Sequence, residues 1–260
     1  MSRIARSISR RLYHPNALEH QAKFPLFPLT YGSDSLQYKV LNNTLKNHVP
    51  EHGFNERAIV ASLNELELGS SVLSALGSDN SPSFLNVAPS VLELVKFHLV
   101  TKRYAITQEL DSELANSDTA TYNAPALKTL FQRRLELNKP VAPHLSQLLS
   151  ILSIPGEFLV KSALPELHRL SDDMVYYSNE TDSPDFAWYS KRVAISSAFV
   201  SSELFMAQDK SPDYGQTFEF AAEKLDRVTR LGQYYTNTEE YLWYTLLMSI
   251  NLAKSQLTRC

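Results

Sequence analysis

Hydrophobic residues recur along this chain at helical spacing, and prolines divide the pattern into segments. Leu36, Val40 and Leu45 share one helical face and predict a first helix that ends before Pro50. The same periodicity predicts further helices over residues 55–68, 91–115, 126–138, 145–154 and 157–170. We find no convincing alternating run that is rich in β-branched residues. The pattern therefore predicts an all-α fold.

Two later helices are predicted to begin with the same local sequence. Ser183-Pro184-Asp185 and Ser211-Pro212-Asp213 each supply an N-cap hydroxyl, a proline for the first helical position and an acid for the positive helix end. The helix between them, residues 185–208, is apolar over much of its circumference, which predicts a central and buried position. Such a helix either fills a solid core or lines a cavity for a lipid. The candidate lipid-binding residues are Phe199, Leu204 and Phe205.

The last segment predicts an amphipathic C-terminal helix over residues 236–260. It opens with Thr236-Asn237-Thr238-Glu239, the sequence of a capping box. Its candidate membrane-contact residues share one side and are Leu242, Trp243, Leu246, Leu247 and Ile250. This side either packs on the core or lies on a bilayer surface. The apolar run between Glu240 and Lys254 has 13 residues, fewer than the ~20 that a membrane-spanning helix needs.

The composition excludes several kinds of chemistry. Among the 7 glycines, no two lie closer than Gly69 and Gly77, so neither a P-loop nor a Rossmann dinucleotide turn can form. The single cysteine, Cys260, rules out a disulfide framework and a cysteine-based zinc site. His48 and His52 are spaced like metal ligands on a helix, but Pro50 lies between them. We therefore expect no metal, no cofactor and no enzymatic activity.

Charge is distributed unevenly along the chain. Residues 1–14 contain Arg3, Arg6, Arg10 and Arg11 and no acid, with Ile4, Ile8 and Leu12 on one helical face. This combination predicts a mitochondrial transit peptide, with a basic tail as the alternative. Residues 15–33, which hold prolines at 15, 25 and 28, are expected to be an irregular linker. Without the four arginines the net charge changes from −3 to −7, which disfavours nucleic acid as a partner.

An all-α chain that opens with short helices also suggests a helix-turn-helix at residues 34–78, as in ligand-responsive bacterial repressors. A DNA-reading version needs cations on its second and third helices to meet phosphates. No Lys or Arg occurs between Arg57 and Lys96. We therefore expect a degenerate motif, and a ligand-responsive transcription regulator remains only the alternative function.

Five sequence blocks identify a resemblance to a known family over residues 45–231. The blocks are His52-Gly53-Phe54-Asn55-Glu56-Arg57-Ala58, Val95-x-Phe97-His98, Asp185-Phe186-Ala187-Trp188-Tyr189-Ser190-Lys191-Arg192, Ser202-Glu203-Leu204 and Gln208-Asp209-Lys210-Ser211-Pro212-Asp213-Tyr214. In this order and spacing they resemble the mitochondrial ubiquinone (coenzyme Q) biosynthesis lipid-binding family, the ninth Coq protein family, and most closely its yeast member.

The resemblance implies a fold like that of the tetracycline-repressor superfamily, without DNA binding, over an all-α lipid-binding domain at residues 34–232. It implies a non-enzymatic homodimer, peripheral on the matrix side of the mitochondrial inner membrane. Such proteins bind isoprenoid quinone intermediates or phospholipid, and present the quinone to the demethoxyubiquinone hydroxylase within the biosynthetic complex. The partner-binding residues that the resemblance implies are Met174, Asp185, Trp188, Tyr189 and Arg192.

Overall fold

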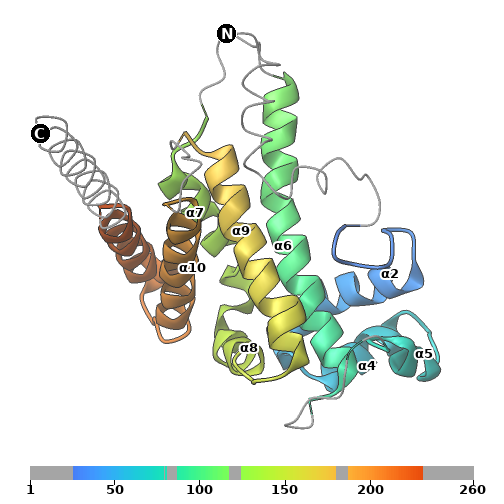
Figure 1. Ribbon diagram of the computed structural model, residues 1–260. Helices are drawn as coiled ribbons and strands as arrows, with labels where there is room; N and C mark the ends of the chain where they lie inside the picture. The colour runs from blue at the N-terminus through green and yellow to red at the C-terminus, as the bar shows by residue number, and fades with distance from the viewer. Residues whose placement is uncertain (1–25, 79, 81–86, 117–123, 180–186, 231–260) are drawn as a thin grey trace, which may run out of the picture.

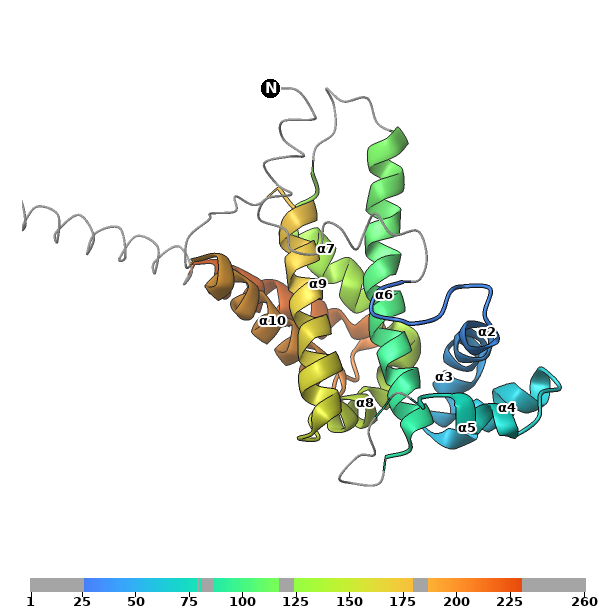
Figure 2. The same ribbon diagram turned by 45° about the vertical axis from the view of Figure 1, so that its right-hand side comes forward.

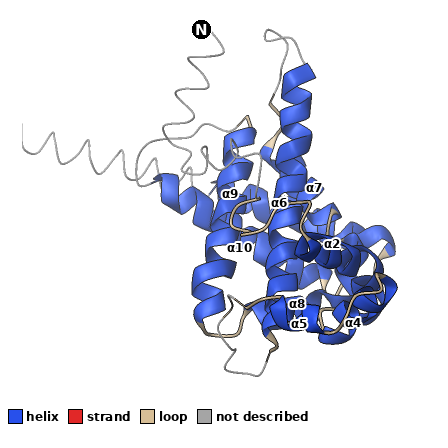
Figure 3. Ribbon diagram, turned by 90° about the vertical axis from the view of Figure 1, so that its right-hand side faces the viewer, coloured by secondary structure: helices blue, strands red, loops and turns tan. Residues whose placement is uncertain are grey.

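The computed structural model describes residues 26–78, 80, 87–116, 124–179 and 187–230. Over these ranges the chain is built from helices and turns, without a β-strand (Figure 3). The predicted all-α class is confirmed for this part of the protein. The predicted transit peptide, the Ser183-Pro184-Asp185 helix start and the 236–260 helix lie outside the described residues.

Two long helices form the centre of the bundle. Helix α6 (Pro89–Asn116) and helix α9 (Leu164–Tyr177) run side by side in Figures 1 and 2. Arg103 of α6 joins them through buried ion pairs, to Glu166 and, at 3.0 Å from Nη1 to Oδ2, to Asp173 of α9. The bounds of α6 agree with the predicted helix over 91–115, because its apolar residues keep helical spacing throughout.

The N-terminal helices pack against one end of α6 (Figure 2). They are α2 (Leu36–Asn43), the π-turn η2 (Thr44–His48), α3 (Val49–His52), α4 (Glu56–Glu65) and α5 (Ser71–Ala75). The first helix does end before Pro50, at Asn43, but the chain stays helical beyond it through η2 and α3. Pro50 lies in the first turn of α3, where its missing N–H is not needed, and α3 ends at Gly53, whose φ is +77°.

The segment before α2 is irregular but fixed to the bundle. Leu29 is only 2% exposed and belongs to the hydrophobic core around α6. The carbonyl oxygen of Phe27 accepts a hydrogen bond from Arg103 at 2.9 Å, and the Tyr31 hydroxyl donates one to Glu93 at 2.8 Å. These contacts attach residues 26–31 to α6.

A second group of helices packs on the other side of α6 and α9. It contains α7 (Leu127–Glu136), the 3₁₀ turn η3 (Lys139–His144), α8 (Leu145–Leu152) and the π-turn η4 (Leu159–Ala163), which runs directly into α9. The predicted helix over 126–138 is confirmed, whereas the one over 157–170 continues to Tyr177. A separate hydrophobic cluster joins α7, α9 and α10.

Helix α10 (Ala187–Met206) lies at the side of the bundle in Figures 1 and 2. Ile195, Phe199 and Met206 are buried, but Tyr189 is 61% exposed and Val193 63% exposed. The prediction of a central and buried helix is therefore correct for one face of α10 and wrong for the other. Neighbouring helices cover one face of α10, and a second apolar face is open to solvent.

The start of the helix over residues 215–230 differs from the prediction. Pro212 begins a short 3₁₀ turn (Pro212–Tyr214), and Asp213 and Tyr214 both have positive φ, so this turn cannot continue as an α-helix. The capping carboxylate comes from Asp209, whose Oδ2 accepts hydrogen bonds from the amide of Thr217 at 2.9 Å and from its hydroxyl. Ser-Pro-Asp is thus part of the turn before the helix.

Candidate functional site

A largely apolar cavity of about 220 Å³ lies between α6, α7, α8, α9 and α10. Its lining residues are Leu99, Arg134, Leu149, Leu152, Ser153, Leu159, Ala163, Leu164, Glu166, Leu167, Leu170, Phe199, Val200 and Glu203. Exposure changes across this lining. Leu164 is 51% exposed, whereas Arg134 and Glu203 are almost completely buried, so the cavity runs from an apolar opening at η4 and α9 to a charged inner end.

The inner end is held together by hydrogen bonds. Nη1 of Arg134 donates to Oδ1 of Asn138 at 2.7 Å, and Nδ2 of Asn138 donates to Oε1 of Glu203 at 2.7 Å. The Arg134 guanidinium lies 5.2 Å from the centre of the Phe199 ring. Nε of Arg134 is buried and makes no hydrogen bond to any described residue. One donor at the inner end is therefore left unsatisfied by the part of the chain that the structure describes.

Burial determines the electrostatics of this network. It raises the pKa of the Glu203 carboxyl, while the nearby Arg134 charge and the Asn138 hydrogen bond act in the opposite direction. Burial also lowers the pKa of Arg134, which Glu203 and Glu166 partly offset. Because arginine stays protonated in proteins, the inner end keeps a buried positive charge on Arg134.

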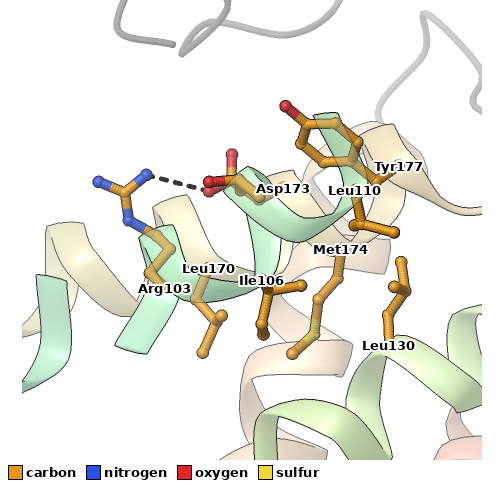
Figure 4. Close-up of a pocket in the computed structure, with 9 residues that line it drawn as sticks. Arg103, Ile106, Leu110, Leu130, Leu170, Asp173, Met174 and Tyr177 are labelled. Carbon is orange, nitrogen blue, oxygen red and sulfur yellow. Dashed lines mark hydrogen bonds and ion pairs between the residues drawn. The ribbon is translucent and has the colours of Figure 1, made fainter. Parts of the chain in front are cut away.

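A second, smaller pocket lies around the Arg103–Asp173 ion pair (Figure 4). Its volume is about 10 Å³, room for one water molecule at most. Met174 reaches down between Ile106 and Leu130 in this view, and its side chain is 2% exposed. This pocket is a packing defect between α6, α7 and α9, and it is too small for an organic ligand.

The three candidate lipid-binding residues are not brought together. Phe199 lines the cavity, but neither Leu204 nor Phe205 does. Leu204 is 48% exposed, and the ring of Phe205 stacks on Phe220 at 4.5 Å. From α10, Phe199, Val200 and Glu203 reach the cavity, whereas Leu204 and Phe205, one and two positions further along, point in other directions.

Arg134 and Glu203 were missed by the sequence analysis as cavity residues. A signal was present, because each charged residue falls on an otherwise buried face. Arg134 follows Leu127 and Phe131 at i+7 and i+3, and Glu203 follows Phe199 at i+4. A charge on a buried helical face usually has a partner or a function, and here it marks the inner end of the cavity.

The residues expected to bind a partner occupy different environments. Tyr189 is exposed, whereas Met174 and Arg192 are buried. Nε of Arg192 donates to Oδ1 of Asp172 at 2.6 Å. Asp185, the side chain of Trp188 and the candidate membrane-contact residues lie outside the described part of the structure.

The described ranges contain neither a cluster of metal-binding side chains nor a helix able to span a membrane. No group of three or more His, Cys, Asp or Glu side chains is arranged there to hold a metal ion. His48 and His52 stack with ring centroids 6.4 Å apart, and Nε2 of His48 lies 2.8 Å from a Glu65 carboxyl oxygen. None of the described helices combines the length and hydropathy that crossing a bilayer requires.

Comparison with known proteins identifies the family. The COQ9 family model matches residues 160–232. The chain is 55% identical over 249 residues to the mitochondrial ubiquinone biosynthesis protein COQ9 of Saccharomyces cerevisiae, covering 96% of this chain and 94% of the relative. It is 56% identical over 252 residues to the Eremothecium gossypii protein of that name, covering 97% of this chain and 98% of the relative. It is 28% identical over 202 residues to the human protein, covering 77% of this chain and 60% of the relative. The resemblance seen in the sequence is confirmed: the chain belongs to the COQ9 family of mitochondrial ubiquinone biosynthesis proteins.

Proposed function

We propose that this protein is a non-enzymatic lipid-binding accessory protein of ubiquinone biosynthesis. It binds isoprenoid quinone intermediates and presents them to the demethoxyubiquinone hydroxylase. The names of the relatives support a role in ubiquinone biosynthesis. The observation that carries the binding function is the cavity of about 220 Å³ between α8, α9 and α10.

The character of this cavity fits an amphipathic ligand. Most of its lining is apolar, and burying a hydrocarbon chain gains roughly 0.8 kcal/mol per CH₂. Its opening adjoins two exposed apolar residues, Val160 of η4 and Leu164 at the start of α9. A lipid can therefore move from a bilayer into the cavity while its hydrocarbon stays in contact with apolar side chains.

The proposed location is the matrix side of the mitochondrial inner membrane, as a peripheral homodimer. The arginine-rich, acid-free residues 1–14 support import, and relatives are named as mitochondrial. The amphipathic pattern of residues 236–260 supports contact of Leu242, Trp243 and the other apolar residues of that side with the membrane. Residues 34–78 are proposed to be a degenerate helix-turn-helix that does not read DNA.

The proposed partner surface includes the open face of α10. Tyr189, Val193 and Leu204 are all exposed and lie on one side of this helix, with Val200 between them. Exposed apolar and aromatic side chains in one stripe are typical of protein interfaces. The family resemblance also assigns Trp188 and Asp185, which are close to Tyr189 in the sequence, to the partner surface.

The test is to identify the lipid that accompanies the protein. The full chain is purified under native conditions, and its bound lipids are measured by mass spectrometry after extraction, beside a sample unfolded and washed before extraction. We expect isoprenoid quinones or phospholipids in the native sample alone. A native sample without either class of lipid would contradict the proposal.

A further inference from the structure

The size of the cavity limits which part of a lipid it can hold. A protein cavity of about 150 Å³ is sufficient to bind benzene. The cavity here, at about 220 Å³, accommodates one substituted six-membered ring. A tail of several isoprene units has several times the volume of such a ring. The tail of a polyisoprenoid ligand must therefore extend beyond the cavity.

The chemistry of the inner end is suited to a ring that carries oxygen. Arg134 is 1% exposed and its Nε–H has no acceptor among the described residues. Asn138 hydrogen-bonds one carboxyl oxygen of Glu203, and a carboxylate accepts hydrogen bonds at both of its oxygens. A hydrocarbon tail placed here would leave the Arg134 donor buried and unsatisfied, which is unfavourable, whereas an oxygen atom of the ligand would satisfy it.

We propose that the ligand enters this cavity ring first: a ring oxygen accepts a hydrogen bond from Nε of Arg134, a ring hydroxyl, where present, donates one to Glu203, and the isoprenoid tail leaves between α8 and α9. This inference rests on the proposed function, since it specifies how an isoprenoid ring lipid is held. Phe199 supports it, because this aromatic side chain lines the cavity next to the Arg134 guanidinium, and aromatic rings favour contact with other rings.

The direction of the tail follows from exposure. Leu164 lines the cavity and is half exposed, and Val160 in the preceding turn is 65% exposed. These side chains continue the apolar surface from the cavity to the outside of the protein. A tail that leaves here remains in contact with apolar atoms and can stay partly in the bilayer while the ring is bound.

Two matched probes test whether ring oxygens are recognised. One is a methoxy-benzoquinone carrying a geranyl tail, and the other is geranylbenzene, which has the same tail and no ring oxygen. Both are delivered from cyclodextrin, and the ligand bound to the full chain is measured after gel filtration. We expect the wild-type protein to bind the quinone at least tenfold more tightly than geranylbenzene.

The decisive variant is Arg134→Leu/Glu203→Leu, because it removes both buried charges of the network together and leaves neither of them uncompensated. We expect the preference for the quinone to fall below threefold, while geranylbenzene still binds. Arg134→Met, which removes the Nε–H donor and leaves the hydrogen bond between Asn138 and Glu203 in place, should weaken the preference at least threefold and decides the question if the double variant does not fold. The matched control is Arg227→Leu/Glu223→Leu, an exposed ion pair at 2.6 Å, which should keep the wild-type preference.

Each outcome has a distinct meaning. Equal binding of the two probes by the wild-type protein overturns the ring-first inference and leaves the lipid-binding function in place. An unchanged preference in both cavity variants also overturns it. Failure of the wild-type protein to bind either probe contradicts the proposed function together with this inference.

The tail path has its own test. A quinone with three isoprene units should bind the wild-type protein more tightly than a quinone with one. Val160→Ser/Leu164→Ser should reduce this gain in affinity and leave the preference for ring oxygens unchanged. Leu36→Ser, at an exposed apolar residue of α2, is the control and should retain the full gain. If the double variant retains the full gain as well, the proposed exit between α8 and α9 is wrong.

Discussion

Arg192 of α10 and Asp172 of α9 form an ion pair at 2.6 Å, in which neither side chain is more than 1% exposed. A buried charge is tolerated only when another charge and hydrogen bonds compensate the loss of hydration. The pair therefore fixes how α10 lies against α9. Because Arg192 is also a proposed partner-binding residue, its substitution would change the fold and the surface together.

Removing one member of this pair should be strongly destabilising. Asp172→Ala takes the carboxylate away from a buried guanidinium, and we expect the free energy of unfolding to fall by about 3–5 kcal/mol. The measurement is urea denaturation followed by circular dichroism. Asp172→Leu/Arg192→Met should recover most of the loss, because it removes both charges. Similar stability of Asp172→Ala and the wild-type protein would show that the pair does not hold α10 in place.

His98 should make stability depend on pH. Burial lowers the pKa of its ring well below the ordinary value of 6.5, with the Arg134 and Lys102 charges acting in the same direction. The unfolded chain therefore binds a proton as the pH falls below 6.5 while the folded chain does not, so stability is lost on acidification. From pH 7.5 to pH 5.5 we expect this residue to contribute a loss of roughly 1.4 kcal/mol.

The variant that checks this is His98→Phe, which keeps a ring against Phe54 but cannot titrate. Urea denaturation at pH 7.5 and pH 5.5 should show a loss of stability that is smaller in the variant than in the wild-type protein by roughly 1.4 kcal/mol. His52→Gln, at an exposed histidine, is the control and should keep the wild-type dependence. An identical loss in His98→Phe would exclude His98 as the cause.

Gly53 should not tolerate a side chain. Its backbone has φ +77° and ψ −170°, a region that is essentially restricted to glycine. A Cβ there would also collide with the amide oxygen of Gln147, which accepts from the Phe54 amide at 3.0 Å. We expect Gly53→Ala to lower the free energy of unfolding by about 1–3 kcal/mol. Gly156→Ala, where a Cβ meets nothing within 4 Å, should stay within about 0.5 kcal/mol of wild type.

The local sequence predicted where the helices lie better than it predicted how deeply their residues are buried. The start of α4 could be predicted from Asn55, which caps the helix by accepting from the Ala58 amide at 3.0 Å, because capping depends on residues close in sequence. The burial of Arg103 could not, because its partners Glu166 and Asp173 lie more than 60 positions away. The apolar sequence of α10 predicted burial, yet hydrophobicity alone does not distinguish a core face from an interface face.

The candidate site was predictable to a similar extent. Phe199 was identified because it lies on an apolar helix, but the cavity also depends on Ala163 and Leu164, which a π-turn places at the opening. A π-turn shifts the register of the following residues and has no strong sequence signal. The family, by contrast, could be identified directly, because its sequence blocks are preserved in order and spacing.

Filling the cavity should reduce lipid binding without unfolding the protein. Ala163 is 8% exposed and lines the cavity, so Ala163→Phe places a ring in the space proposed for the ligand. We expect at least fivefold less lipid in the purified protein by mass spectrometry, with a urea midpoint equal to or above that of wild type. Val193→Phe, on the exposed face of α10, adds a ring outside the cavity and should leave the bound lipid unchanged. Equal lipid in both variants would place the ligand elsewhere.

The open face of α10 gives a test of partner binding that is independent of stability. Tyr189 and Val193 are 61% and 63% exposed, so Tyr189→Ser/Val193→Ser removes little buried surface and should change the free energy of unfolding by less than about 0.5 kcal/mol. If this face contacts the demethoxyubiquinone hydroxylase, the amount of hydroxylase that co-purifies with the variant should be at least tenfold lower than with the wild-type protein. The reason is that aromatic and apolar residues at an interface centre carry most of the binding energy. Leu36→Ser/Val60→Ser replaces two exposed apolar residues on the N-terminal helices and should bind the hydroxylase normally. Normal binding by the α10 variant would exclude this face, whereas loss in both variants would indicate a general effect of surface polarity and not a specific contact.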